Sequence, residues 1–197
     1  MSYKRLTILC DLDSIVVDLQ TKWYAVYNEK YNDNITVDDI TDWEVHKFVS
    51  DECGTKIYNM LTPKLFDVLD PLDGAIEALD ELYQAGHEIV FITASPLGCA
   101  DAKISWVTKH IKWATHKNVI IGHKKHLVKG DVLIDDSPAN LHLHKLNNPE
   151  TKLLTISYPY NEEVDDICDV RSGSWRDTRT FWKDAVKFIE ELSYEKV

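Results

Sequence analysis

The stretch of sequence that decides the fold is Leu6-Thr-Ile-Leu-Cys10, followed directly by Asp11-Leu-Asp-Ser-Ile-Val-Val-Asp18. An apolar segment of strand length leads into two carboxylates, Asp11 and Asp13, at positions i and i+2. Residues with this spacing share one face of a strand, and just beyond the end of the strand both can turn toward one point. The sequence therefore predicts a strand with two convergent acids at its carboxyl end.

A second apolar run, Val132-Leu-Ile134, ends in the same way at Asp135-Asp136. The carboxyl ends of parallel strands lie at one edge of a sheet, so the two acidic pairs predict a single acidic site at that edge. Carboxylate oxygens suit a hard cation such as Mg²⁺. We therefore predict a site that holds Mg²⁺ and acts on a phosphate group.

Strand patterns and helix patterns alternate along most of the chain. Further strands are predicted at 88–93, 118–121 and 153–156, and helices at 75–84, 102–111 and 181–192. This alternation predicts an α/β fold with a doubly wound, Rossmann-like parallel sheet. The segment that follows the first strand is different, because it begins with helical spacing and is then polar, aromatic and irregular. We expect it to be a small helical cap, residues 18–72, inserted into an α/β core of residues 1–17 and 73–197.

Composition narrows the class of protein. With 197 residues, 44% of them hydrophobic, the chain can bury one sizeable core. Its net charge of −11 argues against a surface that binds a nucleic-acid polymer. No run approaches the roughly 18 apolar residues of a membrane span, so no membrane partner is expected. The four cysteines lack CxxC spacing, which is typical of reduced thiols in the cytoplasm. A homodimer is left open.

Asp11 and Asp13 can divide the work of phosphate ester hydrolysis. A carboxylate can attack phosphorus only when the phosphate charge is neutralised and a second group protonates the leaving alcohol. This predicts Asp11 as nucleophile and Asp13 as general acid and later base, with Mg²⁺ bridging Asp11 and a phosphoryl oxygen. By itself, a pair of acids after a strand is interpreted equally well as a solvated loop, since acidic residues are common in turns.

Polar residues later in the chain favour the catalytic interpretation. A hydroxyl residue, Thr93 or Ser95, ends the next long apolar strand, and Lys125 precedes a later one, with Lys103 as a second candidate. Hydroxyl and ammonium groups donate the hydrogen bonds that the remaining phosphoryl oxygens need. Each of these residues alone is typical of a helix cap or of the surface. Their common order predicts a phosphate site.

These motifs resemble those of haloacid dehalogenase-type phosphatases, and most closely those of the 5′(3′)-deoxyribonucleotidases. The resemblance covers roughly residues 5–140. It rests on Asp11-Leu-Asp-Ser-Ile-Val-Val-Asp18, Phe91-Ile-Thr-Ala-Ser-Pro96, Lys125 and Leu133-Ile-Asp-Asp-Ser-Pro138. It implies a Mg²⁺-dependent phosphomonoesterase that hydrolyses deoxyribonucleoside 5′(3′)-monophosphates through an aspartyl-phosphate.

The resemblance also implies roles for individual residues. Asp11 becomes the nucleophile, and Asp13 the acid and base whose backbone carbonyl also binds Mg²⁺. Asp136 becomes the third protein ligand, while Asp135 orients it or holds a metal-bound water. The phosphate would be bound by Lys103 and Lys125 together with a hydroxyl from Thr93 or Ser95.

Two departures from the family pattern affect these expectations. Ser14 stands where the family usually has glycine, which predicts a slightly altered turn without loss of activity. Ala94 separates Thr93 from Ser95, where the family commonly has adjacent hydroxyl residues, so the sequence leaves open which hydroxyl meets the phosphate.

Aromatic residues of the expected cap bear on the substrate. Trp43 either stacks on a nucleobase or anchors the core of the cap, and Tyr24 and Phe48 carry the same ambiguity. Specificity lies in this part of the chain, so the same chemistry on another small phosphate ester is the main alternative. A receiver-like phosphoacceptor module and a catalytically silent nucleotide-binding protein are weaker rivals. The histidine pairs at 142/144 and 123/126 are interpreted as surface residues.

Overall fold

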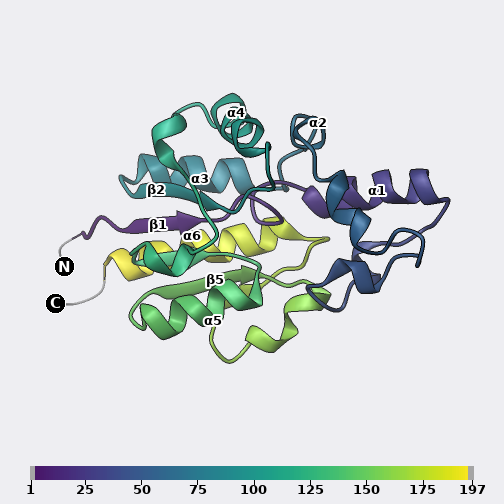
Figure 1. Ribbon diagram of the computed structural model, residues 1–197. Helices are drawn as coiled ribbons and strands as arrows, with labels where there is room; N and C mark the ends of the chain where they lie inside the picture. Colours follow the sequence, from purple (N-terminus) through teal and green to yellow (C-terminus); the bar gives the residue numbers. More distant parts are fainter. Residues whose placement is uncertain (1–2, 195–197) are drawn as a thin grey trace.

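The computed structural model describes residues 3–194 and contains one sheet of six parallel strands (Figure 1). The strands, in the spatial order β3-β2-β1-β4-β5-β6, confirm the predicted α/β fold class. In chain order they are β1 (Thr7–Cys10), β2 (Glu88–Thr93), β3 (Val119–Ile121), β4 (Val132–Ile134), β5 (Lys152–Ile156) and β6 (Val170–Ser172). Because β1 pairs with both β2 and β4, the acids that follow β1 and β4 lie side by side.

Successive side chains along the strands are buried on opposite faces of the sheet. On β1, Ile8 and Cys10 belong to a large core that includes residues of three helices, α3 (Ala75–Gln84), α4 (Ala100–His110) and α6 (Thr178–Ser193). Leu9, which points the other way, packs in a smaller cluster with Leu141 of α5 (Pro138–Asn147). Both faces are therefore covered, which explains why these strands are apolar throughout.

A helical segment separates β1 from the first helix that packs on the sheet. It contains α1 (Leu19–Tyr31), the 3₁₀ helices η1 (Val37–Asp39), η2 (Val45–Lys47) and η3 (Gly54–Met60), and the short α2 (Pro63–Phe66). Asp18 caps α1 by accepting a hydrogen bond from the Thr21 amide. Figure 1 shows this segment beyond the carboxyl ends of the strands. It agrees with the helical insertion predicted after the first strand.

The remaining elements are three more 3₁₀ helices, η4 (His116–Asn118), η5 (Lys125–Leu127) and η6 (Pro159–Val164). Within residues 3–194, no helix combines the length and the apolar character that crossing a membrane requires.

One surface assignment made from the sequence is wrong. His142 and His123 are exposed, but His144 is fully buried on the inner side of α5. Residues two apart differ by about 200° around an α-helix, and α5 packs so that the side carrying His144 is buried while the side carrying His142 faces the solvent.

Candidate active site

The two acids of the first motif are fixed where β1 ends. The Asp11 amide donates a hydrogen bond to the Ile134 carbonyl of β4 (2.8 Å), which continues the sheet pairing by one residue. The chain then turns at Ser14, whose φ of 58° lies in the left-handed region that glycine adopts most easily. Both acids thus leave the sheet at the edge that the sequence predicted.

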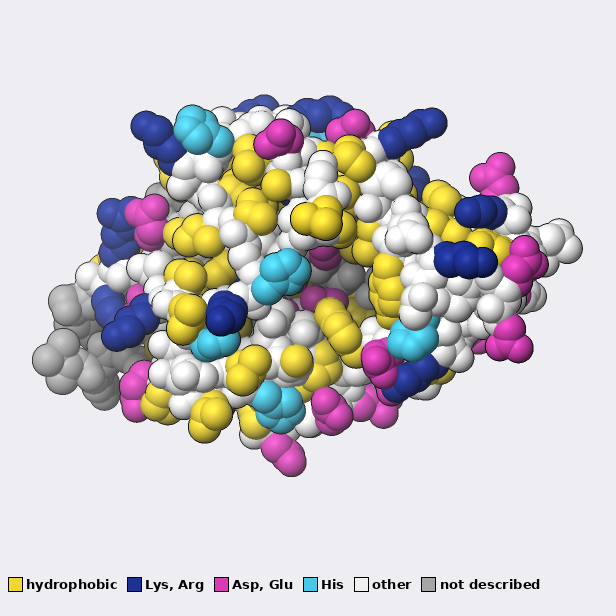
Figure 2. All heavy atoms as spheres, in the orientation of Figure 1, with side chains coloured by type: hydrophobic (Ala, Val, Ile, Leu, Met, Phe, Trp, Pro, Cys, Tyr) yellow, Lys and Arg dark blue, Asp and Glu magenta, His cyan; other side chains and the backbone are white. Residues whose placement is uncertain are grey.

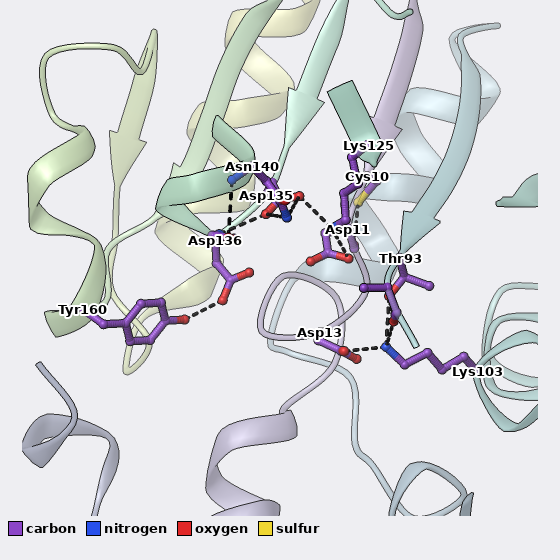
Figure 3. Close-up of polar contacts among 12 residues, drawn as sticks. Cys10, Asp11, Asp13, Thr93, Lys103, Lys125, Asp135, Asp136, Asn140 and Tyr160 are labelled. Atoms are coloured by element: carbon purple, nitrogen blue, oxygen red, sulfur yellow. Dashed lines mark hydrogen bonds and ion pairs between the residues drawn. The ribbon is translucent and has the colours of Figure 1, made fainter. Parts of the chain in front are cut away.

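Lys125 joins Asp11 to Asp135 (Figure 3). Its Nζ lies 2.8 Å from Asp11 Oδ1 and 2.6 Å from Asp135 Oδ2, and all three side chains are buried. Burial opposes the charge of Lys125, yet attraction to the two carboxylates outweighs it and raises the pKa of the lysine. Burial also raises the pKa of Asp135, against the influence of the Lys125 ammonium. The contact is a buried charge network rather than a surface ion pair.

Lys103 holds the second acid. Its fully buried Nζ contacts Asp13 Oδ2, the Ala94 carbonyl and, at 3.0 Å, the Thr93 hydroxyl (Figure 3). Burial raises the pKa of Asp13, and the Lys103 ammonium opposes that shift. The other oxygen, Asp13 Oδ1, is buried with no hydrogen-bond partner among the described residues. Asp13 therefore keeps a free oxygen while its orientation is fixed.

Three carboxyl groups come close enough to share a metal ion. One oxygen each from Asp11, Asp135 and Asp136 lies within 4.8 Å of the others, and all three residues are buried. Burial, followed by the nearby charges of Asp11 and Asp135, raises the pKa of Asp136 well above its usual range. A cation would relieve this accumulation of negative charge, and the all-oxygen donor set fits Mg²⁺. The Asp13 carboxylate is not part of this group, so a contribution from its backbone carbonyl stays a prediction.

Asp135 and Asp136 have different surroundings. Asp135 accepts hydrogen bonds from Lys125, from the Ser137 amide (2.9 Å) and from the Asn140 side chain (3.2 Å). Asp136 accepts one from the Tyr160 hydroxyl at 2.5 Å. The hydrogen bonds to Asp135 hold both of its oxygens, whereas Asp136 has more capacity left for a metal ion.

A cavity of about 210 Å³ opens above these acids. Figure 2 shows it as a hollow near the centre of the face, with acidic side chains visible inside. Its polar end includes Asp11, Asp13, Lys125 and Asp136, and its other walls come mainly from the inserted segment. Those walls are mainly apolar and aromatic, formed by Leu19, Trp23, Tyr24, Ile40, Trp43, Val45, Tyr58 and Leu61, and their polar members are Gln20 and Asp42.

Trp43 lies at this cavity with half of its surface exposed. Its ring makes an edge-to-face contact with Tyr160 at 5.5 Å between centroids. Of the other two aromatic candidates, Tyr24 lines the cavity, while the partly buried Phe48 packs against the core. Half-exposure favours the stacking interpretation of Trp43 over the alternative of a core anchor.

The predicted hydroxyl residues do not line the cavity. Thr93 is buried beside Lys103, and the Ser95 hydroxyl donates to the Pro96 carbonyl at 3.0 Å. Of the described residues, Ala94 is the member of this motif that the cavity wall includes. The structure leaves both hydroxyl assignments as predictions.

Sequence reasoning missed several residues of the cavity wall, among them the polar side chains of Gln20, Asn140 and Tyr160. Gln20 and Asn140 follow the first and last acidic motifs by a few residues, so proximity in sequence was an available signal. Tyr160 offered a weaker signal, which is its position after β5, the strand next to β4.

Comparisons with known proteins agree with this geometry. A family model described as 5′ nucleotidase, deoxy (pyrimidine), cytosolic type C protein matches residues 5–187. A 5′(3′)-deoxyribonucleotidase of Clostridium acetobutylicum is 35% identical over 184 residues, covering 93% of this chain and 98% of that protein. A 5′(3′)-deoxyribonucleotidase of Bacillus subtilis is 25% identical over 171 residues, covering 86% of this chain and 94% of that protein.

Solved structures show the same fold at low sequence identity. A HAD hydrolase of Entamoeba histolytica, family IA, variant 3, has a TM-score of 0.58 and 14% identity, covering 99% of this chain and 100% of that one. A HAD family hydrolase of Deinococcus radiodurans has a TM-score of 0.57 and 14% identity, covering 86% of this chain and 91% of that one.

These matches confirm the resemblance drawn from the motifs and give no support to a receiver-like module. Because the family model spans most of the chain, and because the clostridial relative aligns over nearly its full length, the chain belongs to the 5′-nucleotidase, deoxy (pyrimidine), cytosolic type C family and is a nucleotidase, which makes it a hydrolase.

Proposed function

We propose that this hydrolase converts deoxyribonucleoside 5′(3′)-monophosphates into nucleoside and phosphate through an aspartyl-phosphate on Asp11. The observation that carries the proposal is the contrast between the two ends of the cavity. One end gathers acids around a buried lysine, and the other is a wall of mainly apolar and aromatic side chains. A phosphate fits the first and a nucleoside the second.

In the first step a carboxylate oxygen of Asp11 attacks phosphorus, and the bond from phosphorus to the ester oxygen breaks. Asp13 gives its proton to the departing alkoxide of the nucleoside. The raised pKa of Asp13 supports this role, because a group must hold a proton near neutral pH in order to donate it. Lys103 keeps the acid oriented through its contact with Asp13 Oδ2.

In the second step water attacks the phosphorus of the aspartyl-phosphate, and Asp13, now ionised, accepts a proton from that water. The bond from phosphorus to the Asp11 oxygen breaks, which releases phosphate and restores the carboxylate. Lys125 stays beside Asp11 in both steps and offsets its negative charge when it leaves as a carboxylate.

A divalent cation belongs to the proposal. Asp11 and Asp136 are the side chains that would hold Mg²⁺, with the backbone carbonyl of Asp13, while Asp135 orients the group through Lys125 and Asn140. When bound, Mg²⁺ supplies positive charge that lets an anionic phosphate approach several carboxylates. One further group, the hydroxyl of Thr93 or of Ser95, is proposed as a phosphate donor after side-chain rotation.

The inserted segment, residues 18–72, is proposed to act as a cap that selects the substrate. Trp43 supplies a stacking face for the base, since it is half-exposed at the cavity. Apolar walls disfavour an additional hydroxyl, because burying a hydroxyl without a partner costs about 1–3 kcal/mol. We therefore propose a preference for deoxyribose over ribose, and a cytoplasmic location in keeping with four free cysteines.

The test is a panel of phosphomonoesters assayed with and without Mg²⁺. We expect dTMP or dUMP to be hydrolysed faster than the matching ribonucleotide, with all activity lost in excess EDTA and restored by Mg²⁺. Full activity in EDTA would rule out the metal. Faster turnover of a sugar phosphate than of any nucleotide would indicate the same chemistry on another small ester.

A further inference from the structure

Gln20 and Tyr160 form a hydrogen-bonded pair at the cavity that the proposed reaction does not use. Gln20 comes from the first turn of α1, and Tyr160 from η6 after β5. The Gln20 amide nitrogen donates to the Tyr160 hydroxyl at 2.6 Å, and that hydroxyl donates to Asp136 Oδ2 at 2.5 Å. The pair therefore connects the inserted segment to a carboxylate of the metal group.

The hydrogen bonds fix which way the Gln20 amide faces. The Tyr160 hydroxyl has one proton, which it donates to Asp136 Oδ2, so toward Gln20 the same hydroxyl acts as an acceptor. The second amide proton faces the Ser14 hydroxyl at 3.2 Å. Turning the amide over would place its oxygen against the oxygen of Tyr160. The carbonyl oxygen, Oε1, is therefore held in one direction.

Gln20 Oε1 has no hydrogen-bond partner among the described residues, although the side chain is only 8% exposed and lines the cavity. A buried acceptor without a donor is unfavourable, and such groups are rare in folded proteins. An oriented acceptor at a substrate cavity is suited to a donor on the substrate.

We infer that Gln20 is a specificity-determining residue whose carbonyl oxygen accepts a hydrogen bond from the sugar hydroxyl that does not carry the phosphate, and that Tyr160 is its positioning residue. Two hydrogen bonds connect Gln20 to Asp136 through Tyr160, so the Gln20 side chain lies near the phosphate end of the cavity. The sugar hydroxyl is the donor nearest to phosphorus in a nucleoside monophosphate. Base N–H groups lie farther away.

This inference rests on the proposed function and refines it. It predicts that the free sugar hydroxyl strengthens substrate binding through a hydrogen bond to the enzyme. The same acceptor serves a 3′-hydroxyl in a 5′-phosphate and a 5′-hydroxyl in a 3′-phosphate, since both are donors at a similar distance from phosphorus.

The experiment compares dTMP with 2′,3′-dideoxythymidine 5′-monophosphate, which lacks the 3′-hydroxyl. We expect kcat/KM of the wild type to favour dTMP by about tenfold. Gln20→Met, similar in size but without an acceptor, should reduce that ratio to near one by slowing dTMP. Gln84→Met, at an exposed site on α3, is the matched control and should keep the wild-type ratio.

Tyr160→Phe tests the positioning role, because it leaves Gln20 in place but frees its amide. We expect the ratio to fall in this variant as well, mainly through KM of dTMP. A second readout needs no nucleotide turnover: thymidine should inhibit p-nitrophenyl phosphate hydrolysis more strongly than 3′-deoxythymidine, and Gln20→Met should equalise the two inhibition constants.

The outcomes separate this inference from the proposed function. Nucleotide turnover with an unchanged ratio in Gln20→Met, or with no preference for dTMP in the wild type, overturns the role of Gln20 alone. Absence of turnover for every deoxynucleotide overturns the proposed function together with this inference. Should Gln20→Met fail to fold, a ratio in Tyr160→Phe equal to that of the wild type overturns the inference.

Discussion

The polar groups at the two ends of β1 differ in how completely they are paired. At the amino end each group has a partner. The Leu6 amide donates to His87 Nδ1 at 3.2 Å, and the Thr7 amide donates to Asp131 Oδ2 at 2.8 Å. Lys4 completes the arrangement by contacting Asp131 Oδ1 at 2.6 Å. The side chains of His87 and Asp131 accept the hydrogen bonds of backbone amides that have no strand partner at this point.

Beyond the carboxyl end of β1, by contrast, some polar atoms have no hydrogen-bond partner among the described residues. Asp13 Oδ1 and Gln20 Oε1 are buried without hydrogen-bond partners in residues 3–194, and burial raises the pKa of Asp13 and Asp136. Burial of polar groups therefore does not by itself indicate a functional site. Buried polar atoms without hydrogen-bond partners do, because they are unfavourable in the free protein and become favourable only when a ligand binds.

The largest expected effect is at the carboxyl end. Asp11→Asn should lower kcat for dTMP by about 10⁴-fold or more, because an amide cannot form the acyl phosphate. The melting temperature should change little, since the amide nearly matches the carboxylate in size. Steady-state kinetics and thermal unfolding check both points, with Asp101→Asn at an exposed site as control. Wild-type turnover by Asp11→Asn would remove Asp11 from the reaction.

At the amino end of β1, a substitution should lower stability and leave kcat unchanged. Asp131→Ala should reduce the free energy of unfolding by about 2 kcal/mol, because it leaves the Thr7 amide without its partner. The kcat should stay as in the wild type. Urea unfolding and assays at saturating substrate provide the measurements, and the exposed Asp166→Ala provides the control. A kcat loss without a stability loss would break the distinction between the two ends.

A smaller effect on catalysis is expected when an aromatic side chain of the cavity wall is removed. Trp43→Ala should raise KM for dTMP by about fivefold to tenfold through lost stacking, with little change for p-nitrophenyl phosphate. Tyr194→Ala is a suitable control, since Tyr194 is 51% exposed against 50% for Trp43. An equal rise in KM on both substrates would place Trp43 in the packing of the cap.

The smallest effect concerns pH. Burial, and then the charge of Arg5, lowers the pKa of His87, against the influence of Asp131. The unfolded chain therefore takes up a proton near pH 6.5 that the folded chain resists, so stability falls as the pH drops below that value. Protonating Nδ1 would also remove the acceptor of the Leu6 amide.

His87→Asn keeps an acceptor near that position but does not titrate. Between pH 7.5 and 5.5 the wild type should lose more unfolding free energy than the variant, by at most about 1.4 kcal/mol per pH unit. Urea titrations at three pH values measure it. Parallel stability curves for the two proteins would show that His87 does not contribute.

The clustering of acids and lysines at the carboxyl edge could be predicted from the sequence, because each part of its signal is local. An apolar run followed by acids appears twice, and parallel strands place their carboxyl ends together. Lys125 and Lys103 were identified by their order in the chain, and the structure puts both in contact with the acids. Which hydroxyl binds phosphate was not settled by the motif, since Ala94 interrupts it.

Other features arise from contacts between distant parts of the chain. The sequence did not predict β6, because its three residues lack a strand pattern and are held by pairing with β5. Solvent exposure of His144 was misjudged, since only the packing of α5 decides which side of that helix is buried.

The sequence by itself determined the fold class, the helical insertion and the acidic edge, because periodicity and strand-end residues are properties of short segments. Only the tertiary structure decided which atoms in the cavity have partners. Gln20 and Tyr160 lie 140 residues apart, and no local pattern connects them. The role that we infer for Gln20 Oε1 depends on packing that fixes its amide and leaves this oxygen without a donor from residues 3–194.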